Sequence, residues 1–237
     1  MSQDAPFQRI LLKLSGEILT ATEKQENPLF EVGSSIKKLI EKDIEVALVI
    51  GGGNIFRGRD AKKLNMKRAS ADHAGLLATM INGIFIKQVL DNIGVDSVVL
   101  SALFMPQIFE QYDVHKAKKY LKEKKVVIFV AGIGTPYFST DTAAVLRALE
   151  IEAEVILKGT KVNGIYEKDP KLEPDQQKYD QVSCSTILEN RLNCMDMTAA
   201  ALAREQKLPM IVFDLFQEGA IEKAALNKPI GTYVEGK

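Results

Sequence analysis

The sequence contains no tryptophan, only two cysteines among 237 residues, and no net charge. Cys184 and Cys194 are too few for a disulfide framework or a four-cysteine zinc site, so we expect a reducing compartment, the cytoplasm. Lys plus Arg and Asp plus Glu are both 31, which gives no general attraction to nucleic acid. We therefore expect any positive potential to be local.

Long apolar runs and several familiar motifs are also missing. The first ten residues, MSQDAPFQRI, have no signal core, and we expect no membrane-spanning stretch. No GxxxxGK[ST] is present and no GxGxxG follows a predicted strand, which excludes a P-loop enzyme and the usual dinucleotide fingerprint. The HRD and DFG motifs are absent, which excludes a protein kinase.

Short apolar runs alternate with amphipathic stretches along almost the whole chain. The runs predict strands at 9–13, 45–50, 95–100, 126–131, 154–158, 210–213 and 231–234. The other stretches predict helices near 32–42, 70–92, 114–124, 141–150, 185–190, 198–206 and 220–226. This alternation predicts one domain over residues 1–237, a three-layer α/β/α sandwich with a mainly parallel central sheet.

Two stretches carry further expectations. Residues 57–68 are basic and irregular in pattern, and residues 159–175 contain Gly164 and two prolines, so both are expected to be loops. The helix at 70–92, with Ser70 as its expected cap, has a wide apolar face made by Leu77, Met80, Ile81, Ile84 and Phe85. A subunit interface or a well-buried core position would each explain that width.

The strongest local signal is EVALVIGGGNIFRG at 45–58. A predicted buried strand runs directly into Gly51, Gly52 and Gly53, whose backbone N–H groups have no side chains to keep a ligand away. Arg57 adds a permanently charged fork that suits phosphate or carboxylate. This combination predicts an oxyanion site at the carboxyl end of a strand.

Four predicted strand ends carry glycines or charged residues suited to an oxyanion site: 13–16, 51–54 with Arg57, 132–141, and 158–160. In a parallel sheet these ends share one edge, so their loops can line one crevice. Phosphoryl transfer needs positioning and charge neutralisation, which glycine turns, Lys13 and Arg57 supply. Asp141 could orient the lysine or a magnesium ion, although a helix cap is the commoner role for Asp at such a position.

Four segments resemble the bacterial uridylate (UMP) kinases of the amino-acid kinase superfamily. They are KLSGE at 13–17, VIGGGNIFRG at 49–58, DHAGLLAT at 72–79, and TDTAAVLRALEIEAEVILKGTKVNGIY at 140–166. The resemblance covers nearly the whole chain. It implies transfer of the γ-phosphoryl group of ATP to UMP, giving UDP and ADP for pyrimidine nucleotide biosynthesis, with Mg²⁺ accompanying ATP and no metal ligands assigned on the protein.

The resemblance also implies a role for each matching residue. Catalysis would rest on Lys13, Arg57 and Asp141, with Asp141 orienting Lys13. The ATP site would comprise Lys13, Leu14, Ser15, Gly16, Gly53, Arg57, Thr160, Tyr166 and Asp169. The UMP site would comprise Gly52, Asp72, Ile133, Gly134, Thr135, Pro136, Tyr137, Phe138, Ser139 and Thr140, with Asp72 accepting from the ribose hydroxyls.

The chain departs from this family in a few places. Family members usually have AGTGNPFF where residues 131–138 read AGIGTPYF, so Ile133 removes a hydroxyl and Thr135 replaces an amide. Residues 20–30 lack the glycine-rich pattern linked to activation by GTP, which leaves that activation open. The family further implies inhibition by UTP and a homohexamer. Two alternatives stay open: a kinase acting on carbamate or an acyl carboxylate, and a non-catalytic nucleotide-binding or oxyanion-storage protein.

Overall fold

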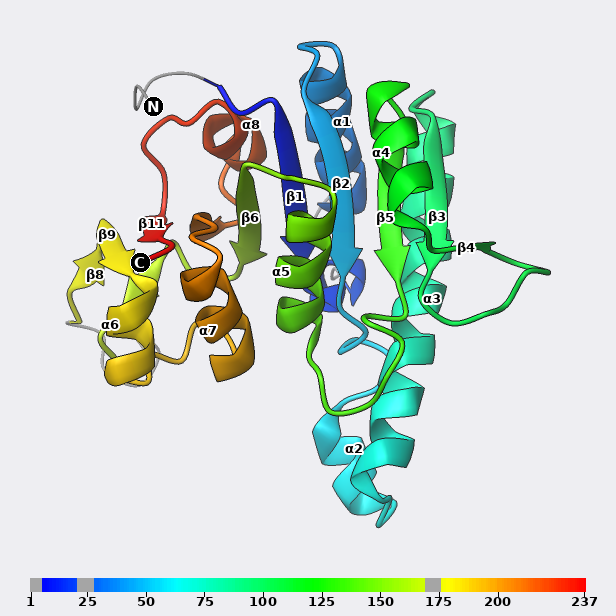
Figure 1. Cartoon of the computed structure of the whole chain (residues 1–237), viewed down its shortest axis with the longest axis horizontal. Coiled ribbons are helices and arrows are strands. Elements are labelled where there is room, and N and C mark those ends of the chain that lie inside the picture. Colours follow the sequence, from blue (N-terminus) through cyan, green and yellow to red (C-terminus); the bar gives the residue numbers. More distant parts are fainter. Residues whose placement is uncertain (1–5, 21–27, 169–175) are drawn as a thin grey trace.

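A computed structural model of the chain describes residues 6–20, 28–168 and 176–237. Its centre is a nine-stranded sheet in the order β4-β3-β5-β2-β1-β6-β10-β11-β9 (Figure 1). Neighbouring strands are parallel except for the β10–β11 pair, which is antiparallel. The strands are β1 (Arg9–Leu14), β2 (Glu45–Ile50), β3 (Ser97–Ser101), β4 (Glu110–Gln111), β5 (Val126–Val130), β6 (Val155–Thr160), β9 (Gln181–Ser183), β10 (Met210–Asp214) and β11 (Thr232–Glu235).

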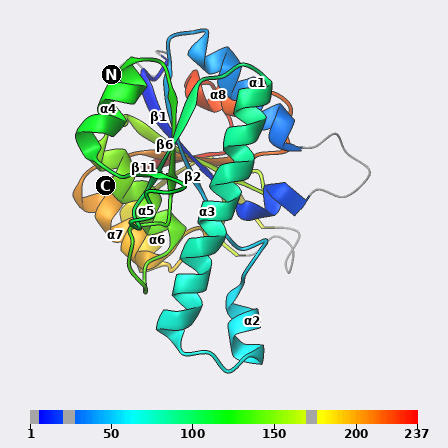
Figure 2. The same cartoon turned by 90° about the vertical axis from the view of Figure 1, so that its right-hand side faces the viewer.

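Helices cover both faces of this sheet (Figures 1 and 2). One face packs against α1 (Pro28–Ile40), α3 (Arg68–Asn92) and α8 (Ala220–Ala225). The other packs against α4 (Val114–Lys122), α5 (Thr140–Glu150), α6 (Cys184–Glu189) and α7 (Met197–Glu205). The predicted three-layer sandwich with a mainly parallel sheet is therefore confirmed.

The central strands are apolar along their whole length because both of their faces are covered. In β2, Leu48 and Ile50 belong to the core beside α1 and α3, whereas Ala47 and Val49 belong to the core beside α4 and α5. Successive side chains of a strand point to opposite faces, so a strand between two helix layers needs apolar residues at every position. This arrangement fixes the carboxyl ends of the strands along one edge.

The prediction of a loop at 57–68 was wrong. A short helix, α2 (Gly58–Lys63), forms there, and the Asp60 carboxylate accepts a hydrogen bond from the backbone N–H of Arg57 at 3.1 Å. The next helix, α3, begins at Arg68 with Lys67 as its N-cap, so Ser70 is not the cap. Together α2 and the start of α3 project beyond the carboxyl ends of the strands (Figures 1 and 2).

The expected loop at 159–175 also contains regular structure. A two-residue strand, β7 (Ile165–Tyr166), pairs in antiparallel fashion with β8 (Lys178–Tyr179). Glycines and prolines in the stretch concealed this pairing from a reading of the sequence. The hairpin lies directly after β6 and so borders the edge where the strand ends meet.

By length and composition alone, the 25-residue helix α3 is long and apolar enough to cross a membrane, which is weak evidence for a membrane span. A core helix of a globular protein can have the same length and composition, and 44% of the most apolar 18-residue stretch of α3 is buried in the protein. Leu77, Ile81, Ile84 and Phe85 remain 42–49% exposed, while Met80 is buried. The wide apolar face therefore divides into a buried stripe and an exposed one.

Candidate active site

The four predicted strand ends lie side by side. The strands β5, β2, β1 and β6 are consecutive in the sheet, and Lys13 of β1 pairs in register with Val49 of β2 and Lys158 of β6. Loops that follow these strands must therefore border one crevice. The structure confirms this part of the prediction.

The centre of the crevice holds two lysines bound to one aspartate. Lys13 Nζ lies 2.7 Å from Asp141 Oδ1, and Lys158 Nζ lies 2.5 Å from Asp141 Oδ2. Lys158 also donates to the Cys194 carbonyl oxygen at 2.6 Å. The predicted Lys13–Asp141 contact is present. The sequence analysis placed Lys158 at a strand end of the expected crevice but gave it no contact, because its position opposite Lys13 is set by strand register.

Electrostatics in this cluster favours the ionised carboxylate. Burial alone would raise the pKa of Asp141, but the ammonium groups of Lys13 and Lys158 outweigh burial and hold that pKa at about 2. The pKa of Lys158 is lowered because the loss of solvation outweighs the attraction of Asp141. Asp141 follows the cap of α5, which is Ser139, so capping is not the role of Asp141.

The glycine run is fixed by contacts that differ among its residues. A Cβ on Gly52 would lie 2.7 Å from the Cβ of Ala78 in α3, which explains glycine there by close packing against the helix. The fully buried Asn82 donates to the Gly51 carbonyl at 2.7 Å and exchanges hydrogen bonds with Asn54. Asn82 was not recognised from the sequence, because an Asn within an amphipathic helix gives no signal of its own.

A cavity of about 450 Å³ lies on the β6 side of the crevice. Cationic side chains outnumber carboxylates in its lining: Lys13, Lys158, Lys161, Lys168 and Arg191 against Glu17 and Glu167. Of the residues expected to bind ATP, it includes Lys13, Ser15, Thr160 and Tyr166. The side chain of Leu14 is fully buried in the core, so only its backbone could contact a ligand. Asp169 lies outside the described residues.

The remaining residues expected at the ATP site, Gly16, Gly53 and Arg57, are not among those that line this cavity. A Cβ on Gly16 would lie 2.4 Å from the Gly51 carbonyl oxygen, so glycine allows the loops after β1 and β2 to approach. Arg57 donates from Nε to the Gly53 carbonyl at 2.6 Å and forms an ion pair with Glu17. Gly53 itself lines the second cavity, together with residues expected to bind UMP, and Arg57 is held beside it.

The second cavity, of about 180 Å³, lies on the β2–β5 side. Half of the residues expected to bind UMP line it, namely Gly52, Asp72, Phe138, Ser139 and Thr140. The other half do not belong to its lining; they precede Phe138 in the loop after β5 and are Ile133, Gly134, Thr135, Pro136 and Tyr137. Asp72 binds Arg68 Nε at 2.7 Å and accepts from the Tyr137 N–H at 2.8 Å, so it ties the start of α3 to this loop.

Two further side chains hold the loop after β5. The buried Thr79 hydroxyl accepts from the Ala131 N–H at 2.8 Å and donates to the Leu76 carbonyl at 2.7 Å. At the far end of the loop, Asp196 accepts from the hydroxyl of Thr142 at 3.0 Å and from Ser139, while it caps α7 as predicted. The last residue of DHAGLLAT therefore supports the loop after β5.

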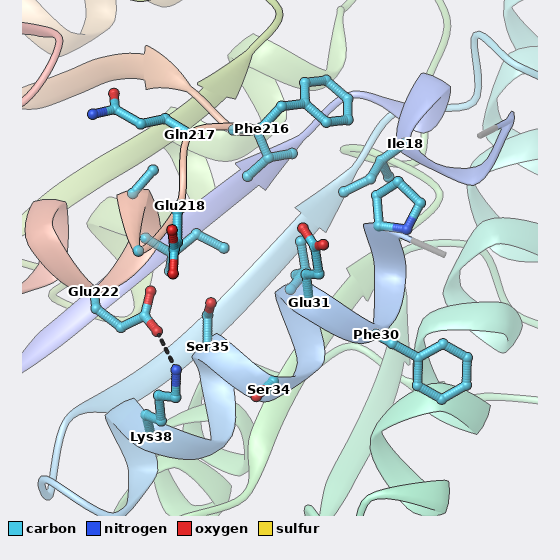
Figure 3. Close-up of a pocket in the computed structure, with 16 residues that line it drawn as sticks. Ile18, Phe30, Glu31, Ser34, Ser35, Lys38, Phe216, Gln217, Glu218 and Glu222 are labelled. Atoms are coloured by element: carbon cyan, nitrogen blue, oxygen red, sulfur yellow. Dashed lines mark hydrogen bonds and ion pairs between the residues drawn. The ribbon is translucent and has the colours of Figure 1, made fainter. Parts of the chain in front are cut away.

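A third cavity, of about 560 Å³, lies between α1 and α8 (Figure 3) and shares no lining residue with the two cavities of the crevice. Its wall carries the Lys38–Glu222 ion pair at 3.1 Å, with Glu218 and Ser35 nearby in the figure. None of the residues expected at a nucleotide site is among those that line it. The site is therefore assigned by its chemistry and not by cavity size.

The fold and this crevice define a class of protein. The chain belongs to the amino acid kinase family, whose model matches residues 8–214, and it is a phosphotransferase. It is similar to the UMP kinase from Bacillus anthracis, with 31% identity, coverage of 98% of this chain and 97% of that chain, and a TM-score of 0.93. It is also similar to the UMP kinase from Ureaplasma parvum, with 36% identity, coverage of 97% and 99%, and a TM-score of 0.90.

A more distant likeness concerns the fold alone. The uridylate kinase from Archaeoglobus fulgidus is 24% identical, with a TM-score of 0.71 and coverage of 95% of this chain and 99% of that chain. The family assignment contradicts the alternative of a non-catalytic binding protein.

Proposed function

We propose that this kinase transfers the γ-phosphoryl group of ATP to UMP. The observation that carries the proposal is a pair of cavities at adjacent strand ends, one bordered by the loop after β1 and the other by the loop after β2. The cavity with Lys13 and Ser15 is rich in cations and suits a triphosphate, and the cavity with Gly52 and Asp72 suits a nucleoside monophosphate. The similarity to two UMP kinases supports UMP as the acceptor.

Positioned charge accounts for the chemistry in this proposal. The transferring phosphoryl group spreads negative charge over its oxygens, and fixed cations stabilise that charge without reorganisation. Lys13 and Lys158 supply the positive charges, while Asp141 binds both ammonium groups and sets their positions. Backbone N–H groups of the glycine run would bind the phosphates from the opposite side.

Mg²⁺ enters this proposal with ATP as part of the substrate. Asp141 is bound to two lysines, which leaves it unsuited to hold a metal ion. Within residues 6–20, 28–168 and 176–237, no group of three His, Cys, Asp or Glu residues could hold one. The phosphates themselves are therefore the proposed ligands, and the ion would neutralise part of their charge.

The acceptor is tested by competition. With ATP as donor, we expect UMP to be phosphorylated in preference to carbamate and acetylglutamate, because only a nucleotide has a ribose for Asp72 to bind. CMP carries the same ribose, so its rate relative to UMP measures selection of the base. Phosphorylation of carbamate or acetylglutamate in place of UMP would establish the alternative substrate class. Substitution of Ile133 by Thr, the residue common in the family, then measures how much the missing hydroxyl affects the choice between UMP and CMP.

Other parts of the proposal concern assembly and control. The exposed stripe Leu77, Ile81, Ile84 and Phe85 supports a homo-oligomer formed through α3, and the family implies a hexamer. Inhibition by UTP, a cytoplasmic location and a role in pyrimidine nucleotide biosynthesis remain predictions from the resemblance. A single domain is proposed because one continuous sheet crosses the described structure.

A further inference from the structure

Glu17 ends the KLSGE segment and has no role in the function proposed above. One oxygen of its carboxylate pairs with Arg57, and the other lies 2.5 Å from Lys161 Nζ. These three residues follow three different strands, β1, β2 and β6. We refer to Arg57, Glu17 and Lys161 as the clasp.

The clasp lies where the donor phosphates are proposed to bind. Glu17 and Lys161 line the larger cavity of the crevice together with Lys13, and Arg57 is held to Gly53 at the border of the smaller one. The Glu17 side chain is 25% exposed, against 38% for Arg57 and 49% for Lys161. The Glu17 carboxylate is thus paired with one cation that lines the proposed triphosphate site, Lys161, and with a second, Arg57, that lies beside it.

Two physical arguments favour exchange of these partners. Guanidinium and ammonium groups bind phosphate oxygens at least as readily as carboxylate oxygens, so a triphosphate competes directly with Glu17. Partly exposed ion pairs contribute only about 0–1 kcal/mol each, so they can be broken during binding. A triphosphate also offers enough oxygens to take both cations at once.

We propose that Glu17 holds Arg57 and Lys161 in the empty site and releases both to the phosphates of ATP, so that Glu17 sets the affinity for the donor. This inference rests on the proposed function. The two pairs are already broken in the bound ground state, so their loss contributes equally to ground state and transition state. Glu17 therefore acts on the KM for ATP and not on kcat.

The test is the Glu17→Gln variant, which keeps the shape of the side chain and removes its charge. We expect the KM for ATP to fall by about threefold to tenfold with kcat nearly unchanged. Calorimetric titration with the non-hydrolysable analogue AMP-PNP should show the same fall in Kd. Loss of a merely structural contact would instead raise KM or lower kcat.

Three variants separate the clasp from general electrostatics. Glu167→Gln removes another carboxylate from the same cavity, one that pairs with neither clasp cation in the described structure, and should give a much smaller change. Glu17→Asp retains the charge and should stay close to wild type. In a Lys161→Met background, one of the two competing pairs is gone, so Glu17→Gln should give a smaller gain than in wild type.

An unchanged or higher KM for ATP in a folded Glu17→Gln variant would overturn the inference, as would an equal effect of Glu167→Gln. Wild-type protein that makes no UDP would refute the proposed function instead. In that case the AMP-PNP titration still measures whether Glu17 competes with a triphosphate.

Discussion

Asp141 shows how a single residue can gain a role that its position in the sequence does not specify. Near the start of a helix, an Asp is most often a cap. In the fold, Ser139 caps α5, and Asp141 is bound by Lys13 of β1 and Lys158 of β6. The sequence reading predicted one of these contacts through the family resemblance, whereas the contact with Lys158 depends on strand register.

Asp141→Asn should inactivate and destabilise the protein. The change leaves two buried ammonium groups without their counterion, which typically costs about 3–5 kcal/mol of unfolding free energy. We expect kcat to fall about a hundredfold or more, because the lysines lose their fixed positions. Steady-state kinetics and urea unfolding measure the two effects, and wild-type values for both would contradict the role of Asp141.

The same residue predicts a dependence of stability on acid. Its pKa in the folded protein is about 2, below the ordinary value of 3.8, so the ionised form stabilises the folded state above that ordinary value. This contribution is lost as the pH falls from about 4 towards 2. Unfolding free energies of wild type and Asp141→Asn should therefore converge over that interval, and a constant difference would show that the carboxylate charge is not responsible.

At the scale of elements, helices and strands could be predicted from the sequence wherever the local pattern agrees with the burial found in the structure. Buried strands and amphipathic helices follow from their periodicity, and the structure places them close to the expected bounds. The short helix α2 and the β7–β8 hairpin were missed because polar composition and glycine favour a loop locally. Their formation depends on contacts such as Asp60 with the Arg57 backbone and the pairing of Ile165 with Tyr179.

Helix α3 supports the glycine run through the buried amide of Asn82. Asn82→Ala should therefore disturb the site, although Asn82 lines neither cavity. The change leaves the Gly51 carbonyl without its donor, and we expect a loss of about 1–3 kcal/mol of unfolding free energy together with a lower kcat. Gln88→Ala, on an exposed position of the same helix, is the matched control and should have little effect. Equal effects of the two changes would exclude a specific role for Asn82.

At the scale of the whole molecule, one edge of the sheet collects the residues that were scattered in the sequence. The order of the strands brings Lys13, Lys158 and the glycine run together, and the family resemblance predicted which segments would take part. The division of the crevice into two cavities was expected only in outline. The lining of the smaller cavity by half of the residues expected to bind UMP follows from tertiary packing, which no local pattern encodes.

The exposed stripe of α3 predicts how the protein assembles. Ile81→Glu combined with Phe85→Glu should place charges in a buried interface and reduce the assembly to smaller species, because unpaired charges are costly to bury. Sedimentation velocity measures the change in mass, with Gln88→Glu as the control on the same helix. A double variant with the mass of wild type would show that this stripe is not the interface.

The central claim is that phosphoryl transfer to UMP occurs at Lys13, and one comparison tests it most directly. Wild type and Lys13→Ala are each incubated with ATP, Mg²⁺ and UMP, UDP is followed by phosphorus NMR, and UMP binding is titrated by calorimetry. We predict that wild type forms UDP, whereas Lys13→Ala loses at least about a hundredfold in rate and still binds UMP nearly as wild type does. No UDP from wild type, or undiminished turnover by Lys13→Ala, would contradict the account.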